Sequence, residues 1–167
     1  ITDSISKELV EITELGYAEI NFDKWRNYPN EIVLRVFAKA LTDINVWNVS
    51  LSSLESVFEE LIKTERSKTL NGCQIIPHKN KYVIVRENRG ISPVEIKINE
   101  RISWDGRFVV HLKSCDKTNI VIYQIGNAED LRKMIDGTPF QSVPNYVLRT
   151  LPGGFIKDKL VLLPNTH

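Results

Sequence analysis

Two segments in the first half of the chain repeat apolar residues every three or four positions. In residues 30–41, which follow Pro29, the repeated positions are Ile32, Val33, Val36, Phe37, Ala40 and Leu41. In residues 54–62 they are Leu54, Val57, Phe58, Leu61 and Ile62. This spacing places the apolar side chains on one face of a helix, so each segment predicts an amphipathic helix with a buried stripe.

A weaker helical pattern opens the chain. It runs from Ile5 to Leu15, with Ser4 as a possible cap and Gly16 at its end. Residues 17–22 alternate loosely and predict a short extended connector. A loop with Trp47 and Asn48 precedes the 54–62 helix, which either Ser50 or Ser52 can cap, the latter with Glu55 in a capping box.

The segment from Thr69 to Glu87 predicts a β-hairpin. Residues 73–76 form one arm and residues 82–85 the other, rich in β-branched and aromatic side chains, with a turn over residues 77–81. Pro77 fits a strand edge, because it has no N–H to donate to a ladder. Asn71-Gly72 accommodates positive φ and marks a sharp entry into the hairpin after the preceding helix.

Short strands dominate after Gly90. Residues 91–99, 101–112 and 119–125 read as strands, and Asp105-Gly106 is a strong hairpin signal between two apolar arms. Asn127 is expected to cap a helix that reaches Ile135. Gly153-Gly154 predicts a loose turn before a last hairpin over residues 155–163.

The resulting fold class is α+β. We expect an N-terminal helical substrate-binding domain, residues 1–90, that ends in the hairpin. A β-rich C-terminal domain, residues 91–167, should form a small antiparallel sheet or an open barrel.

Composition adds little to this picture. Of the 167 residues 42% are hydrophobic and 26% charged, as in ordinary globular proteins. The net charge of +1 gives no global attraction to nucleic acid, so such binding must come from local patches. No apolar run approaches the roughly 18 residues of a membrane span, and no signal peptide opens the chain, so we expect a cytoplasmic protein. The chain begins with Ile1 and not with an initiator Met, so we expect it to be a piece of a longer protein.

Seven Lys and Arg residues lie between residues 63 and 89, around the predicted hairpin. They fit either a solvated surface or a surface that contacts phosphates. Arg35 and Lys39 share one helix face and are open to the same two interpretations. The cations at the end of the 54–62 helix also suit the helix dipole.

The sequence offers no catalytic site. A zinc site needs several Cys or His residues at the spacing of zinc ligands. The cysteines and histidines of this chain do not have that spacing; they are Cys73, Cys115, His78, His111 and His167. Both cysteines are expected to be reduced and buried. Gly153-Gly154 lacks the strand, helix and Lys of a phosphate loop, and no nucleophile elbow or Ser-His-Asp order occurs. Asp105 and Arg107 form a possible polar pair, although backbone turn chemistry alone explains Asp-Gly.

Several short motifs, taken in order, carry a family resemblance. They are residues 30–41 (NEIVLRVFAKAL), 69–75 (TLNGCQI), 83–87 (VIVRE), 104–108 (WDGRF), 151–155 (LPGGF) and 160–164 (LVLLP). From about Gly16 onward the chain resembles tRNA(Ile)-lysidine synthases, in the portion that follows their catalytic ATP-pyrophosphatase domain, and particularly their α-proteobacterial branch.

The resemblance implies a function in tRNA recognition. The full-length enzyme would be an ATP-dependent ligase that attaches lysine to the wobble cytidine of a minor isoleucine tRNA. ATP with magnesium, and lysine, would bind mainly to the N-terminal domain, whose Ser-Gly-Gly-x-Asp-Ser loop is absent here, and the full-length protein could form a homodimer. The residues expected to contact tRNA are Arg35, Lys39, Lys63, Arg66, Lys68, Lys81, Arg86 and Arg89.

Two other functional classes remain to be weighed against this one. A protein-interaction or structural module without a nucleic-acid role would leave the cations as a solvated surface. An independent hydrolase is disfavoured, because no pair of nucleophile and base can be named.

Overall fold

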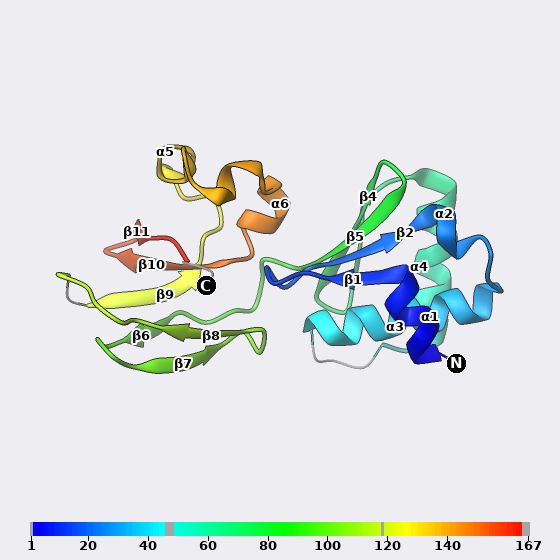
Figure 1. The fold of residues 1–167 in the computed structure, drawn as a ribbon, viewed down its shortest axis with the longest axis horizontal. Helices are drawn as coiled ribbons and strands as arrows, with labels where there is room; N and C mark the ends of the chain where they lie inside the picture. The colour runs from blue at the N-terminus through cyan, green and yellow to red at the C-terminus, as the bar shows by residue number, and fades with distance from the viewer. Residues whose placement is uncertain (1, 46–48, 118, 165–167) are drawn as a thin grey trace. The chain divides into compact units, whose positions relative to one another are not determined.

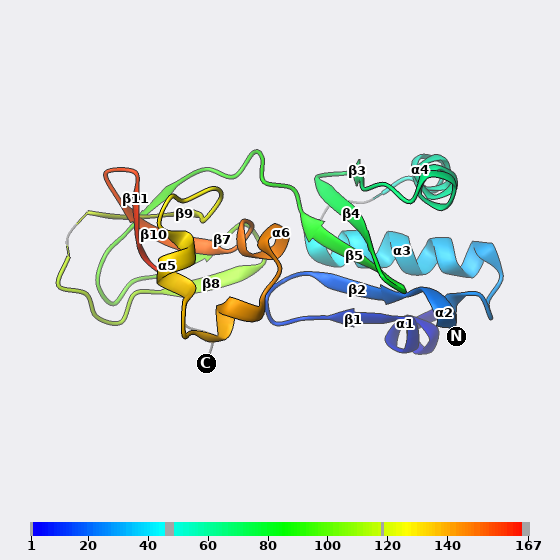
Figure 2. The same cartoon turned by 90° about the horizontal axis from the view of Figure 1, so that it is seen from above.

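The computed structural model describes residues 2–45, 49–117 and 119–164 and is α+β, with antiparallel sheets (Figures 1 and 2). The predicted loop at Trp47 and Asn48, and His167, lie outside the described residues. The chain divides into two compact units, residues 1–87 and 88–167, which are described separately here.

The first unit is built on a five-stranded antiparallel sheet in the order β1-β2-β5-β4-β3. Its strands are β1 (Val10–Ile12), β2 (Ala18–Asn21), β3 (Lys68–Leu70), β4 (Cys73–His78) and β5 (Lys81–Arg86). Its helices are α1 (Thr2–Leu9), α2 (Phe22–Trp25), α3 (Asn30–Asn45) and α4 (Leu51–Thr64). Helix α3 packs across β1, β5 and β4, with α1 beside it, while α4 contacts α3 and β3 (Figure 2).

The predicted stripe of α3 is confirmed at five of its six positions, whereas Ile32 is only partly buried. Val33, Val36, Phe37, Ala40 and Leu41 are buried and face the sheet residues Ile20, Ile75 and Ile84. Aromatic rings close the core at one end: Trp25 stacks on Tyr82 at 5.1 Å between ring centroids, and Phe37 and Phe58 pack around the pair. Such ring pairs add about 0.5–1.5 kcal/mol each beyond their burial.

The prediction for residues 4–22 is wrong in part. Helix α1 ends at Leu9, and residues 10–12 form the edge strand β1. Gly16, with φ of 69°, lies in the turn between β1 and β2 and does not end a helix. The predicted connector is the strand β2, whose ladders to β1 and β5 satisfy its backbone groups on both sides. The first unit therefore contains more sheet than the expected helical domain.

Two details of α4 also differ from the prediction. Ser50 is the cap, since its side chain accepts a hydrogen bond from the Ser53 N–H at 3.3 Å, so the Ser52–Glu55 capping box does not form. Leu54, Phe58 and Leu61 are buried as expected, but Ile62 is 50% exposed because it lies at the flank of the packed face.

The predicted hairpin is confirmed as β4 and β5. Their register pairs Cys73 with Arg86 and His78 with Lys81, so the turn is only two residues long, with Lys79 at φ of 54°. Pro77 lies beyond the part of β4 that pairs with β3, and its missing N–H therefore costs no ladder bond on that side. Asn71-Gly72 does have positive φ, but it forms the turn between β3 and β4 and not an entry from a helix.

The second unit has a four-stranded antiparallel sheet and a separate two-stranded hairpin. The sheet order is β11-β10-β9-β6, from β6 (Val94–Ile96), β9 (Ile120–Gln124), β10 (Pro152–Ile156) and β11 (Lys159–Leu162). The separate hairpin consists of β7 (Arg101–Trp104) and β8 (Phe108–His111). Helices α5 (Leu131–Ile135) and α6 (Asn145–Leu148) and the 3₁₀ turn η1 (Pro139–Ser142) connect β9 to β10. Of the two predicted arrangements, the small antiparallel sheet is observed.

Two expectations for this unit are wrong. Asn127 does not cap α5, which begins after Asp130. Gly153 and Gly154 lie inside β10 and form no loose turn. A Cβ on Gly153 would lie 2.6 Å from Leu160 Cδ1 and 2.9 Å from Ile125 Cγ1, so the strand uses glycine to let the neighbouring side chains approach.

We therefore expect Gly153→Ala to destabilise the second unit by about 1–3 kcal/mol, the usual range for overpacking. Urea unfolding followed by circular dichroism measures this loss. Ser92→Ala is a control of similar size at an exposed position and should change the stability by less than about 0.5 kcal/mol. Equal stability of the two variants would contradict the close packing around β10.

Candidate nucleic-acid interface

Arg35 and Lys39 lie on the solvent-facing side of α3. The Arg35 guanidinium pairs with Glu31 at 2.7 Å, and the Lys39 ammonium pairs with Asp43 at 3.1 Å. Both pairs join residues four apart on one helix, and their side chains are largely exposed. Exposed pairs of this kind contribute only about 0.3–0.5 kcal/mol each, so a phosphate can compete with the carboxylates.

Lys63, Arg66 and Lys68 lie where α4 ends and β3 begins. Lys63 is in the last turn of α4, and Glu65 ends the helix with a left-handed conformation, φ of 50°. Lys63 and Arg66 are exposed, whereas Lys68 pairs with Glu60 of α4. The hydrogen bond and charge of Lys68 lower the pKa of Glu60.

Lys81 and Arg86 stand at opposite ends of β5. They are five residues apart, so their Cα atoms are separated by about 17 Å and their side chains point to opposite faces of the sheet. Lys81 pairs with Glu19 of β2, and the hydrogen bond and charge of Glu19 raise the pKa of Lys81.

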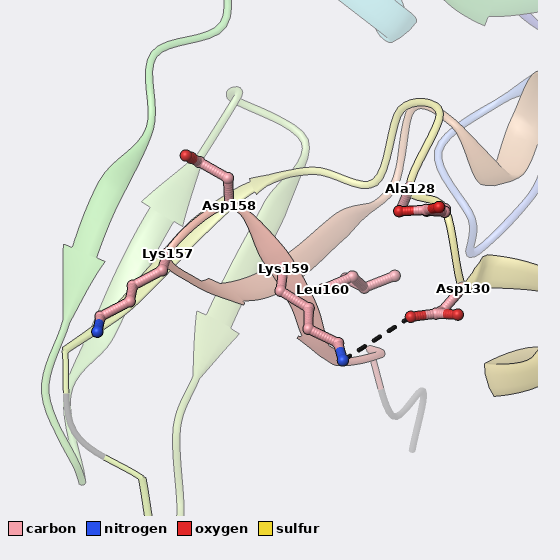
Figure 3. Close-up of a pocket in the computed structure, with 7 residues that line it drawn as sticks. Ala128, Asp130, Lys157, Asp158, Lys159 and Leu160 are labelled. Atoms are coloured by element: carbon pink, nitrogen blue, oxygen red, sulfur yellow. Dashed lines mark ion pairs between the residues drawn. The ribbon is translucent and has the colours of Figure 1, made fainter.

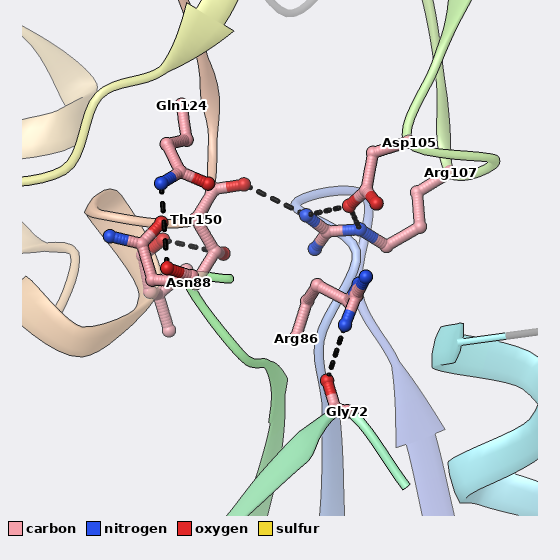
Figure 4. A network of polar contacts seen from close by, with 8 residues as sticks. Gly72, Arg86, Asn88, Asp105, Arg107, Gln124 and Thr150 are labelled. Carbon is pink, nitrogen blue, oxygen red and sulfur yellow. Dashed lines mark hydrogen bonds and ion pairs between the residues drawn. The ribbon is translucent and has the colours of Figure 1, made fainter. Parts of the chain in front are cut away.

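Arg86 is part of the framework of the first unit. Its Nη1 donates to the Gly72 carbonyl oxygen at 2.7 Å (Figure 4). The Glu87 N–H donates to the same oxygen at 2.7 Å. A Cβ on Gly72 would lie 2.6 Å from Arg86 Nη1 and 2.7 Å from Asn45 Nδ2. Gly72 is therefore required both by its positive φ and by this close approach.

Arg89, the eighth predicted residue, is exposed and belongs to the second unit. The other seven lie in the first unit, on the outer face of α3, at the end of α4 and at the two ends of β5. The structure therefore distributes these cations over several surfaces, and their role in tRNA binding stays a prediction.

The charge of the chain is divided unevenly between the units. Residues 1–87 contain eleven Lys and Arg against thirteen Asp and Glu, whereas residues 88–167 contain eleven against eight. The net charge of +1 thus combines an acidic first unit with a basic second unit. Sequence reasoning missed this division, although a count on either side of the predicted boundary reveals it.

The WDGRF segment, residues 104–108, contains a polar cluster in the second unit. Asp105 and Gly106 have φ of 53° and 66°, as turn chemistry requires. Arg107 in addition donates from Nε to Asp105 at 2.9 Å and from Nη2 to the Thr150 carbonyl oxygen at 2.8 Å (Figure 4). Its guanidinium carbon lies 4.8 Å from the Phe108 ring centroid, and the ion-paired side chains are almost fully buried. Asp105 and Arg107 are therefore a polar pair as well as turn residues.

A shallow pocket of about 230 Å³ lies between the start of α5 and the turn from β10 to β11. Asp130 lines this pocket and is 3.9 Å from Lys159 Nζ (Figure 3). Asp130 is also 3.6 Å from Lys133 Nζ. The lining mixes both signs of charge, with Glu129 and Asp158 beside the lysines. It therefore has no preference for an anion or a cation.

The described residues contain no group of three or more His, Cys, Asp or Glu side chains that could hold a metal ion. The glycine pair of the LPGGF segment does not fit a nucleotide phosphate, because the space beside Gly153 is already filled by Leu160 and Ile125. Between residues 2 and 164, excluding 46–48 and 118, every helix is too short or too polar to cross a bilayer.

The chain is similar to curated proteins named tRNA(Ile)-lysidine synthase. It is 24% identical over 134 residues to the protein of the Wolbachia endosymbiont of Brugia malayi, which covers 77% of this chain and 31% of that protein. It is 29% identical over 107 residues to the protein of Wolbachia pipientis wMel, and this match covers 60% of this chain and 25% of that protein. It is 25% identical over 168 residues to the protein of Rickettsia rickettsii, and this match covers 95% of this chain and 35% of that protein.

The chain thus spans about a quarter to a third of the length of these relatives. No family model and no solved structure matches it.

The Lys81–Glu19 pair predicts a specific pH dependence. Because the pKa of Lys81 is raised in the folded chain, the pair stabilises the fold below the ordinary Lys pKa of about 10.4, and this stabilisation is lost as the pH rises through the folded value. We expect Glu19→Gln to lower the free energy of unfolding by about 0.2–1 kcal/mol between pH 6 and 9.

Urea unfolding of both chains at several pH values measures this difference, which should shrink above pH 10.5. Glu95→Gln removes one carboxylate from an exposed position of the second unit and serves as the control. A difference for Glu19→Gln that persists unchanged beyond pH 11 would show that it arises from packing and not from the ion pair.

Proposed function

We propose that this chain is the part of a tRNA(Ile)-lysidine synthase that binds and positions the tRNA. The observation that supports this most directly is the similarity to enzymes of that name, which extends over 95% of the chain but only 35% of the Rickettsia protein. A segment that covers a third of an enzyme, and in which we can name no catalytic group, is better suited to binding the tRNA than to catalysing the reaction.

The whole protein would then be an ATP-dependent ligase that joins lysine to the wobble cytidine of a minor isoleucine tRNA. ATP with magnesium, and lysine, would bind to a separate catalytic domain, and the enzyme would act in the cytoplasm, with a homodimer as one possible assembly. No step of the reaction is assigned to residues of this chain, since the described part contains neither a metal site nor a phosphate loop.

The exposed cations supply the physical basis for tRNA binding. Lys and Arg side chains that replace the counterions of RNA phosphates give affinity and set the register of the complex. Lys63 and Arg66 suit this role best in the first unit, because they are exposed at the end of α4. Arg35, Lys39, Lys68 and Lys81 would exchange a carboxylate partner for a phosphate, and Arg89 would add a contact from the second unit.

Arg86 is less suited to direct contact than the other seven cations. Its Nη1 is already engaged with the Gly72 carbonyl oxygen, and its side chain is partly buried. We assign it the role of holding the β3–β4 turn against the end of β5. We therefore expect replacement of Arg86 to lower the stability of the first unit more than it lowers the affinity for tRNA.

The alternative is a protein-interaction module. Leu51 and Ile62 favour it, since they are 43% and 50% exposed on one flank of α4. Two separated side chains make a small apolar surface, and scattered exposed apolar residues are common in soluble proteins. We therefore rank this function second.

Binding of the chain to a folded tRNA(Ile) transcript tests the proposal. We expect affinity that falls steeply with salt and exceeds that for an unrelated tRNA, because phosphate contacts release counterions. Fluorescence anisotropy at KCl concentrations of about 50–300 mM measures the affinity for each tRNA and the slope of log K against log salt.

The variant Lys63→Glu/Arg66→Glu should lower the slope of log K against log salt by about 1.4–2, or about 0.7–1 per lost contact. Lys7→Glu/Lys24→Glu makes the same charge change elsewhere in the first unit and is the control. Equal binding of the two tRNAs, or no binding at the lowest salt, would argue against a recognition role and in favour of the interaction module.

A further inference from the structure

We propose that the outer face of the β7–β8 hairpin is a second surface that contacts the phosphate backbone of the RNA. This ribbon face consists of Arg101, Ser103, Val109, His111 and Lys113. The inference rests on the proposed function, but it assigns RNA contacts to residues outside the eight cations predicted from the sequence.

The two faces of the hairpin differ sharply. Ile102 pairs with Val110 and Trp104 with Phe108, and these four side chains belong to the core of the second unit. Side chains alternate along a strand, so the positions between them must face the other way. Ser103 is paired with Val109, and Arg101 with His111, on this outer face. Val109 is 74% exposed, Arg101 and Ser103 are exposed, and His111 is partly exposed, so these positions lie outside the core of the second unit.

Arg101, His111 and Lys113 lie near one another at one end of the ribbon face. Arg101 and His111 are directly opposite each other across the two strands, which puts their Cβ atoms about 5 Å apart. Lys113 lies two residues beyond the end of β8, directly after the buried Leu112, whose N–H donates to the Glu100 carbonyl oxygen. Arg101 and Lys113 are exposed and take part in no ion pair among the described residues.

Two of the three acidic side chains between residues 97 and 117 are already engaged. Glu100 Oε2 accepts a hydrogen bond from the Lys97 N–H at 2.8 Å, and Asp105 is paired with Arg107. Residues 97–117 contain five Lys and Arg against three Asp and Glu. In contrast, the region around the α5 pocket, residues 129–136 and 157–159, contains four of each. Most of the excess positive charge of the second unit therefore lies in the segment that carries the ribbon.

The hairpin is also held rigidly, which favours binding to a structured RNA. Arg107 ties its tip to the carbonyl oxygen of Thr150, which precedes β10, at 2.8 Å. Trp104 is 1% exposed and packs against the Phe108 ring at 6.2 Å between centroids. The cations are thus presented on a framework that need not be ordered on binding, so less entropy is lost per contact.

The test compares two double variants of the complete 167-residue chain that carry the same charge change. Arg101→Glu/Lys113→Glu alters the ribbon face, and Arg132→Glu/Lys133→Glu alters α5, where the local charge is balanced. Affinity for the tRNA(Ile) transcript is measured from low to moderate salt by fluorescence anisotropy, and thermal unfolding establishes that both variants are folded. Arg101→Gln/Lys113→Gln replaces the first variant if charge reversal disturbs the fold.

We expect the ribbon variant to lose at least tenfold in affinity at the lowest salt and about 1.4–2 in the salt slope. The α5 variant should keep its slope within about 0.5 of the unsubstituted chain. If the unsubstituted chain binds tRNA and the two variants show the same slope, the ribbon proposal is overturned while the proposed function stands. If the unsubstituted chain does not bind, the proposed function fails, and the ribbon proposal fails with it.

Discussion

The central position of strand β5 is the constraint on which the first unit depends. Tyr82 and Ile84 belong to the core of the unit, Val83 and Val85 are buried as well, and the backbone of β5 pairs with β2 on one side and β4 on the other. A strand in this position cannot shift its register without exposing one set of apolar side chains. The Gly72 carbonyl oxygen then fixes the end of the strand by accepting from Arg86 and from the Glu87 N–H.

This constraint limits what the cations around the hairpin can do. Arg86 donates to the Gly72 carbonyl oxygen and Lys81 pairs with Glu19, so both have partners within the first unit that an RNA phosphate would have to compete with. The basic excess lies instead in the second unit, where Arg101 of β7 and Lys113, just beyond β8, form no ion pair with any residue that the structure describes. We therefore expect the chain to hold RNA by charge presented on rigid antiparallel strands, while the chemistry of the ligase takes place elsewhere.

The sequence predicts the elements whose signals are local. The helical stripe of α3 and the β4–β5 hairpin follow from periodicity within a short segment. Strand β2 was mistaken for a connector because its partner β5 comes more than 60 residues later, as the pairing of Ala18 with Ile84 shows. The prediction for Gly153 and Gly154 is wrong for a similar reason. A glycine pair locally predicts a turn, whereas the close approach of Leu160 and Ile125 to Gly153 is not visible in the local sequence. Glu19, the acid partner of Lys81, is likewise distant in sequence, so spacing along the chain could not show that Lys81 forms an ion pair.

A map of the RNA-contacting residues tests the central claim most directly. Amide chemical shifts of the isotope-labelled chain, followed while a tRNA(Ile) transcript is added at low salt, report on every described surface in one experiment. The account predicts salt-reversible shifts along the outer face of β7 and β8 and at the exposed end of α4, with little change around the α5 pocket. Shifts confined to the apolar flank of α4, or no shifts at all, would contradict it.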